Sequence, residues 1–145
     1  GLGDVYKRQD IIQCPINIFD NRLTKNNFLK RFSDKGIEIH ARSIFLQGLL
    51  LQDGNKIPEE FSKFEKLFKK WENWLKLNNL NSLEACIIYT TFISEVTKIV
   101  VGINSAVQLK EIIKYKNKNI KFEIPKWQNT IDRELIDPRK WKKKY

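Results

Sequence analysis

The sequence predicts an α/β fold in which about three parallel strands are joined by crossover helices. Three observations indicate this class: short apolar strand patterns recur along the chain, amphipathic helical patterns separate them, and polar or glycine residues follow each strand. The 145 residues, 41% of them hydrophobic, can form the core of one ordinary domain. Because three strands leave two open sheet edges, we expect the chain to be part of a larger βα array.

The predicted elements alternate along the chain. The strands are 10–15, 37–41 and 98–101, and the helices are 23–35, 58–77, 83–94 and 104–115. Pro15 ends the first strand, since proline cannot donate to a strand ladder. A loop is expected at 43–56. Thr24 is a candidate helix cap, as is Asn81 or Ser82.

The two ends of the chain differ in composition from its middle. Residues 1–9 resemble a translated sequencing-adaptor tail, so we expect them to be non-native and exclude them from the fold. Residues 10–118 form the predicted βα region. Residues 119–145 are expected to be an irregular, basic tail, and that charge is typical of a solvated segment.

The apolar positions of two predicted helices identify their buried faces. In the first helix these are Phe28, Leu29 and Phe32. The longest helix carries an aromatic stripe at helical spacing, made of Phe61, Phe64, Leu67, Phe68, Trp71, Trp74 and Leu75. We interpret this stripe as core rather than as a platform for stacking nucleic-acid bases.

The net charge of +10 raises the question of a nucleic-acid partner. Lysine outnumbers arginine 21 to 6, which indicates coding bias and solvated helix faces more than bidentate phosphate recognition. Nucleic-acid binding is therefore not expected. Cys14 and Cys86 have no metal-ligand spacing, so we expect buried, reduced thiols and no metal site. There is no apolar run that could span a membrane and no secretory signal, so the expected compartment is the cytoplasm.

Polar residues gather where the predicted strands end. The end of the first strand carries Gln13 and Asn17, that of the second Arg42 and Ser43, and that of the third Gly102, Asn104 and Ser105. The last group opens a helix, whose free N–H groups suit a phosphate. An amide, a guanidinium and such a helix start together suit a nucleotide. His40, the only histidine, shares a strand face with Glu38 and Arg42, and we expect a structural polar network there.

Three segments resemble motifs of the aldo/keto reductases. Residues 13–17 (Gln-Cys-Pro-Ile-Asn) resemble that family's Gln-x-x-Tyr-Asn strand end. Residues 41–50 (Ala-Arg-Ser-Ile-Phe-Leu-Gln-Gly-Leu-Leu) resemble its Ala-Tyr-Ser-Pro-Leu-x-x-Gly-Leu-Leu segment. Residues 100–112 (Val-Val-Gly-Ile-Asn-Ser-Ala-Val-Gln-Leu-Lys-Glu-Ile) resemble its Ile-Pro-Gly-x-x-x-x-x-Gln-Leu-x-Glu-Asn segment. The resemblance covers roughly residues 10–115.

This resemblance implies the C-terminal part of a (β/α)8 TIM barrel that binds NADP or NAD. The implied cofactor-binding residues are Gln13, Asn17, Arg42, Ser43, Phe45, Gln47, Gly48, Gly102, Asn104, Gln108 and Glu111. Gln13 would bind the nicotinamide carboxamide, and Arg42 replaces the aromatic residue that stacks on the ring. Ile112 replaces an Asn that contacts adenine. Gln108 replaces an Arg common in NADP-preferring members, which leaves the choice of cofactor open.

The family's catalytic Asp, Tyr, Lys and His lie in the first half of the barrel, so no catalytic residue is expected in this chain. The parent protein would reduce a small aldehyde or ketone by hydride transfer, and the fragment alone would be inactive and prone to self-association. The alternative is a small basic α/β interaction module without enzymatic activity.

Overall fold

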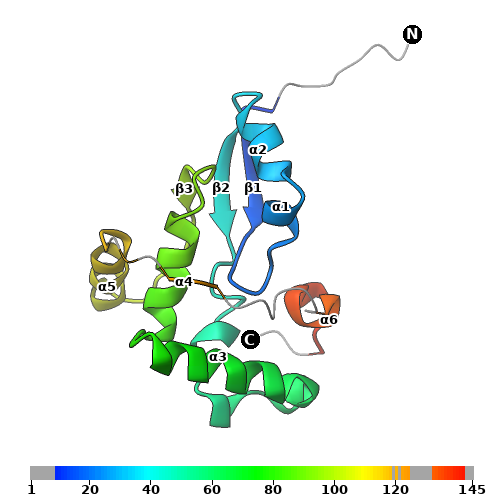
Figure 1. Cartoon of the computed structure of the whole chain (residues 1–145), viewed down its shortest axis with the longest axis vertical. Helices are drawn as coiled ribbons and strands as arrows, with labels where there is room; N and C mark the ends of the chain where they lie inside the picture. The colour runs from blue at the N-terminus through cyan, green and yellow to red at the C-terminus, as the bar shows by residue number, and fades with distance from the viewer. Residues whose placement is uncertain (1–8, 119, 121, 125–131, 143–145) are drawn as a thin grey trace.

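The structure is a computed structural model that describes residues 9–118, 120, 122–124 and 132–142. Its sheet holds three strands in the order β1 (Ile11–Pro15), β2 (Glu38–Arg42) and β3 (Lys98–Ile99), and both neighbouring pairs are parallel (Figure 1). The predicted α/β class with three parallel strands is therefore confirmed. The predicted adaptor tail, except for residue 9, lies outside the described residues.

Helices connect and flank these strands. They are α1 (Arg22–Lys25), α2 (Phe28–Ser33), α3 (Glu65–Leu77), α4 (Ser82–Thr91), α5 (Ala106–Lys116) and α6 (Arg133–Ile136). Short 3-10 turns occupy Leu49–Leu51, Gly54–Lys56, Glu59–Phe64 and Pro138–Lys140. Within the described part of the chain, no helix combines the length and apolarity that a bilayer crossing requires.

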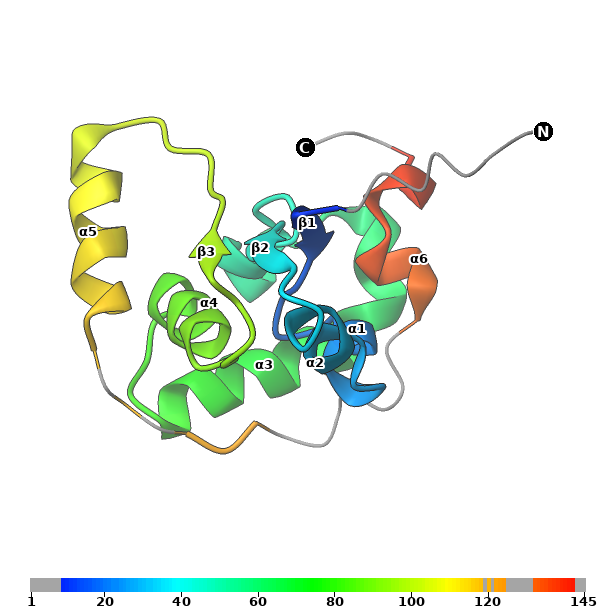
Figure 2. The ribbon, with the colours of Figure 1, turned by 90° about the horizontal axis from the view of Figure 1, so that it is seen from above.

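The two faces of the sheet differ in polarity. On β2, Ile39 and Ala41 are fully buried, whereas Glu38 and His40 are half-buried and Arg42 is exposed. Side chains alternate between the faces of a strand, so one face is apolar and the other polar. Helices α1, α2 and α4 lie on one side of the strands in Figure 2. Both crossovers therefore cover the apolar face, as the alternation predicts.

The prediction of one continuous helix at 23–35 is wrong. Asn27 has a left-handed φ of 54°, which a helix cannot accommodate, and the segment divides into α1 and α2. The break leaves Phe28 exposed although Leu29 is buried as predicted. Thr24 is not a cap: it lies inside α1, and its hydroxyl donates to the Asn21 carbonyl over 2.9 Å.

The aromatic stripe is core, as predicted. The side chains of Phe61, Phe68, Trp71 and Trp74 are all buried. The Trp71 and Trp74 rings stack with centroids 5.5 Å apart, and the Trp71 indole nitrogen donates to the Leu50 carbonyl over 3.4 Å. This stripe therefore holds the segment after β2 onto the helical layer. The first turns of the predicted 58–77 helix are the 3-10 turn Glu59–Phe64, and α3 follows.

Helix α4 is almost entirely buried. Asn81 is its N-cap, as one alternative predicted, and the Asn81 side chain accepts from the Glu84 amide over 2.8 Å. The helix ends at Thr91 rather than at residue 94. Cys86 on α4 and Cys14 on β1 are buried free thiols, and burial raises the pKa of both.

Two later segments also differ from prediction. Strand β3 is shorter than residues 98–101, since it spans only Lys98–Ile99, the register partners of His40 and Ala41. Part of the tail expected to be irregular is regular: α6 forms within it, and Leu135 is fully buried. The Trp141 ring packs edge-on against Phe61, with centroids 4.9 Å apart. These contacts bring residues 132–142, here named the C-terminal segment, onto the body of the protein.

Candidate functional site

A cavity of about 420 Å³ lies at the carboxyl ends of β1 and β2. It brings together four residues that the sequence analysis singled out: Asn17, Arg42, Ser43 and Gln47. The C-terminal segment forms the facing wall. We call this cavity the strand-end pocket. Its position agrees with the general rule that ligands of parallel α/β folds bind beyond the carboxyl ends of the strands.

The loop that follows β2 has an unusual backbone. Ser43, Leu46 and Gln47 have φ angles of 56°, 48° and 55°, and Gly48 has a φ of 84°. A non-glycine residue in this left-handed region costs roughly 1 kcal/mol. Burial of Ile44 and Leu46, each 1% exposed, offsets this cost. The loop is thus fixed in one conformation beside the pocket.

Asn17 connects the two loops of the strand-end pocket. Its side-chain oxygen accepts from the amides of Phe19 and Asp20, over 3.0 and 2.9 Å. Its amide nitrogen donates to the Ser43 carbonyl over 3.3 Å. Because Asn17 is 1% exposed, these bonds satisfy a buried polar group. Its contribution to the site is to hold Ser43 and the turn after β1 in place.

Arg42 is the one arginine of the strand-end pocket without a carboxylate partner among the described residues. One of its terminal nitrogens donates to the Ser43 hydroxyl over 3.3 Å. The side chain is exposed. A guanidinium held in this way keeps a flat face for stacking and several N–H donors for an anion.

Gln13 and His40 lie elsewhere, on the polar face of the sheet, where they are register partners. Glu38 accepts from the His40 ring nitrogen over 2.9 Å and pairs with Lys98 over 2.7 Å. The pKa of Glu38 is lowered, first by the hydrogen bond to Lys98 and then by that to His40. The predicted polar network therefore exists, but Lys98 takes the place that Arg42 was expected to fill.

The remaining predicted residues are separate from the strand-end pocket. Phe45 and Gly48 belong to the strained loop but do not line the cavity, and Gly102, Asn104 and Glu111 are exposed near or on α5. At the start of α5 the Ser105 hydroxyl accepts from the Gln108 amide over 3.1 Å. The Gln108 side chain in turn accepts from the Asn104 amide over 2.9 Å. The helix start is thus capped by its own side chains.

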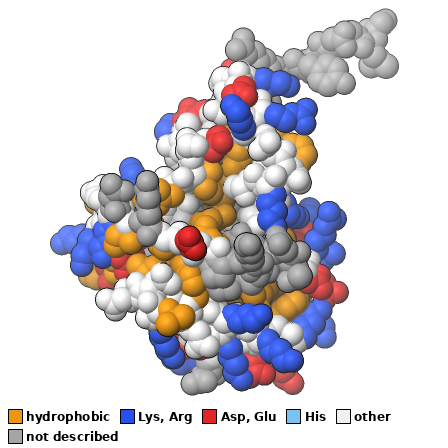
Figure 3. Space-filling view, viewed as in Figure 1, with side chains coloured by type: hydrophobic (Ala, Val, Ile, Leu, Met, Phe, Trp, Pro, Cys, Tyr) orange, Lys and Arg blue, Asp and Glu red, His pale blue; other side chains and the backbone are white. Residues whose placement is uncertain are grey.

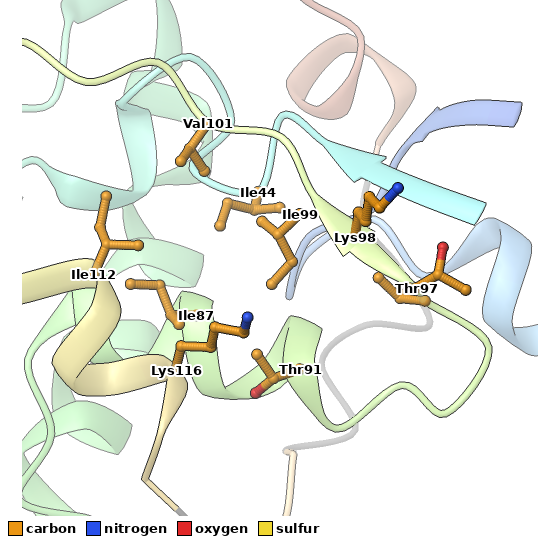
Figure 4. Close-up of a pocket in the computed structure, with 10 residues that line it drawn as sticks. Ile44, Ile87, Thr91, Thr97, Lys98, Ile99, Val101, Ile112 and Lys116 are labelled. Carbon is orange, nitrogen blue, oxygen red and sulfur yellow. The ribbon is translucent and has the colours of Figure 1, made fainter. Parts of the chain in front are cut away.

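A second cavity of about 410 Å³ lies between β3, α4 and α5 (Figure 4). Its lining is mainly apolar, and Figure 4 shows Ile44, Ile87, Ile99 and Ile112 around one gap. Ile112 thus belongs to this apolar cavity. Hydrophobic side chains also reach the surface over α4 and α5 in Figure 3. Several large hydrophobic side chains near this cavity are exposed, among them Ile103 and Val107.

Sequence reasoning missed three charged residues of the strand-end pocket: Arg22, Asp137 and Arg139. A local signal was present. Asp20-Asn21-Arg22 and Asp137-Pro138-Arg139 both have the pattern Asp-x-Arg, and in each the aspartate holds the arginine through two hydrogen bonds of 2.8 and 2.7 Å. The repetition could have suggested two equivalent ion pairs, although not their location in one cavity.

Comparison with protein-family models finds no match for this chain, and no curated protein matches it. Among the described residues there is also no group of three or more His, Cys, Asp or Glu side chains that could hold a metal ion.

Proposed function

We propose that this chain is the cofactor-binding half of an NAD(P)-dependent aldo/keto reductase that reduces an aldehyde or ketone. The observation that carries the proposal is the strand-end pocket. Asn17, Arg42, Ser43 and Gln47 come from two segments of the sequence, were selected by resemblance to cofactor-binding motifs, and line one cavity.

The topology supports a barrel origin for the sheet. The three parallel strands lie in chain order, and the crossover helices cover one face (Figure 2). A barrel wall has this arrangement, with helices outside and the other sheet face turned inward. The polar face that carries Gln13, Glu38 and His40 would then line the interior beneath the cofactor.

The residues present fit a nicotinamide. Arg42 offers a planar cation on which the ring can stack, and Ser43 offers a hydroxyl beside it. The strained loop from Ser43 to Gly48 would follow the adjoining part of the cofactor, including Phe45. The cofactor itself supplies the hydride for the carbonyl carbon, while the protein supplies binding and orientation.

We assign the adenosine part of the cofactor to the start of α5. Gly102, Asn104, Gln108 and Glu111 would contact it, and the exposed Lys110 lies within the same turns. Because Gln108 already accepts from the Asn104 amide, the cofactor would have to replace that bond. We therefore expect weak binding of either NADPH or NADH by this chain.

Titration of the chain with NADPH and with NADH, followed by cofactor fluorescence, tests this function. Arg42→Ala should weaken the affinity about tenfold, since a stacked cation contributes up to about 2 kcal/mol. Arg31→Ala is the matched control, because it removes an arginine on α2 that contacts only Phe28 among the interactions seen. No saturable binding, or equal loss in both variants, would contradict the proposal.

A further inference from the structure

The wall of the strand-end pocket that faces the sheet includes three charged residues outside the cofactor motifs. Arg22 follows the turn after β1, and Asp137 and Arg139 belong to the C-terminal segment. The chain therefore brings two regions more than 100 residues apart into one cavity, opposite Arg42 and Ser43. No cofactor residue predicted from the sequence explains this wall.

Each arginine of this wall is held by its own aspartate, which binds the edge of the guanidinium that carries Nε. Arg22 uses its Nε and one terminal nitrogen to bind Asp20, and Arg139 binds Asp137 in the same way. A guanidinium carries five N–H donors, so each arginine retains donors on its other edge. The aspartates are 2% and 14% exposed and fix the directions of these cations.

The two ion pairs act on each other. The pKa of Arg22 is raised, mainly by its hydrogen bond to Asp20, while Asp137 raises it further and Arg139 opposes this. Arg22, Asp137 and Arg139 line the same cavity, so the two pairs form one charged cluster. Two arginine–aspartate pairs are neutral together, and Arg42 adds one positive charge that no carboxylate among the described residues balances.

We propose that the strand-end pocket binds a small carboxylate, so that the substrate of the proposed reductase is an anionic carbonyl compound such as a 2-oxo acid. Only the carbonyl group of this substrate rests on the proposed function, and the carboxylate site is argued without it. A planar carboxylate can accept two parallel hydrogen bonds from a guanidinium edge. Its single negative charge balances that of Arg42.

A phosphate group fits this cluster less well. It carries a charge of about −1.5 to −2 near neutral pH, which exceeds the one uncompensated cation. The additional charge would be repelled by Asp20 and Asp137. The volume of about 420 Å³ falls within the range of small-molecule sites. The balance of charge therefore favours the carboxylate.

The test is a titration of the full chain with pyruvate, methyl pyruvate and inorganic phosphate, following the arginine Nε–H signals by nuclear magnetic resonance. Pyruvate and its methyl ester share the carbonyl group and differ in the charge. We expect saturable shifts for Arg22, Arg42 and Arg139 with pyruvate, and none with methyl pyruvate.

Variants then assign the binding. Arg42→Gln and Arg139→Gln should each weaken pyruvate binding by about tenfold or more, as expected for a lost charged hydrogen bond. Both side chains are exposed, so both variants should fold, which urea unfolding checks. Arg31→Gln makes the same charge change on α2 and should leave the affinity unchanged.

Three results would overturn the proposal: no saturable shift with pyruvate, equal binding of the methyl ester, or tighter binding of phosphate. The outcome is separable from that of the proposed function. Pyruvate binding without NADPH binding would refute the reductase but retain the carboxylate site, and the reverse pattern would refute only the carboxylate site.

Discussion

The two ends of the predicted cofactor site are built in different ways. At β1 and β2 the loops are connected by Asn17, anchored by the buried side chains of Ile44 and Leu46, and faced by the C-terminal segment. At β3 the strand has only two residues, the following glycine is exposed, and α5 is capped by its own side chains. One end is a formed cavity with a strained backbone, and the other is an exposed helix start beside an apolar gap.

From this difference we expect the end at β1 and β2 to be the one that holds a ligand without a partner. Strained, fixed backbone persists only where the surrounding packing maintains it, and such positions gather at functional sites. Exposed large hydrophobic residues are concentrated at the other end, including Val100, Ile103 and Val107. That surface is consistent with the proposal that a further part of the protein, or a second copy, covers it.

The largest expected effect is on the free energy of unfolding, when one leucine is truncated to alanine at each end of the predicted site. Leu46→Ala removes a side chain that is 1% exposed and should lower the free energy of unfolding by about 3 kcal/mol. Leu109→Ala on α5 removes one that is 39% exposed and should cost less than about 1 kcal/mol. Urea unfolding followed by tryptophan fluorescence measures both. Equal costs would show that the two ends are packed alike.

A second pair of variants compares the backbones. An alanine at position 48 must adopt the φ of 84°, so Gly48→Ala should destabilise the fold by about 1–2 kcal/mol although its Cβ meets no atom within 4 Å. Gly102 has an equally open surrounding and no left-handed φ. Gly102→Ala should therefore be neutral or stabilise by about 0.5 kcal/mol. If alanine stabilised the fold at both positions in the same urea experiment, the claim that the backbone at Gly48 is unfavourable for other residues would be refuted.

A third variant tests whether α5 is held by its own cap. Ser105→Ala removes the acceptor of the Gln108 amide and should cost about 1 kcal/mol in the first turn. Hydrogen exchange should accelerate at the start of α5 and remain unchanged around Ser43. Faster exchange in both regions would instead indicate that the two ends of the site open cooperatively.

The smallest expected effect is a response to acid at the charged wall. The hydrogen bonds from Arg139 lower the pKa of Asp137 from 3.8 to about 2. The ion pair therefore stabilises the C-terminal segment fully above pH 3.8, and this contribution is lost as the pH falls through about 2. The Trp141 indole N–H signal, which reports its bond to Leu135, should shift in that window. Asp137→Asn should show no such step, and an identical titration in that variant would reject the assignment.

Much of the fold was predictable because it depends on local patterns. Alternation at Ile39 and Ala41 identified β2, and the spacing of Phe61, Phe68 and Trp71 identified the buried face of the longest helix. The break at Asn27 was not predictable from periodicity, since apolar spacing continues through it. A left-handed residue interrupts a helix without changing its hydrophobic pattern.

The candidate site was predictable only in part, for a related reason. Asn17, Arg42 and Ser43 follow strands, and parallel strands bring their carboxyl ends together. Arg139 reaches the same cavity only because Leu135 and Trp141 dock the C-terminal segment. That docking joins residues distant in sequence, and no periodic pattern encodes it.

The central claim is that the strand-end pocket, rather than the start of α5, is the part of this chain that recognises the nicotinamide. Backbone amide shifts of the full chain with and without NADPH test it most directly. We predict saturable changes at Asn17, Arg42 and Ser43 that are lost in Arg42→Ala. Changes confined to α5, or no saturable change, would contradict the claim.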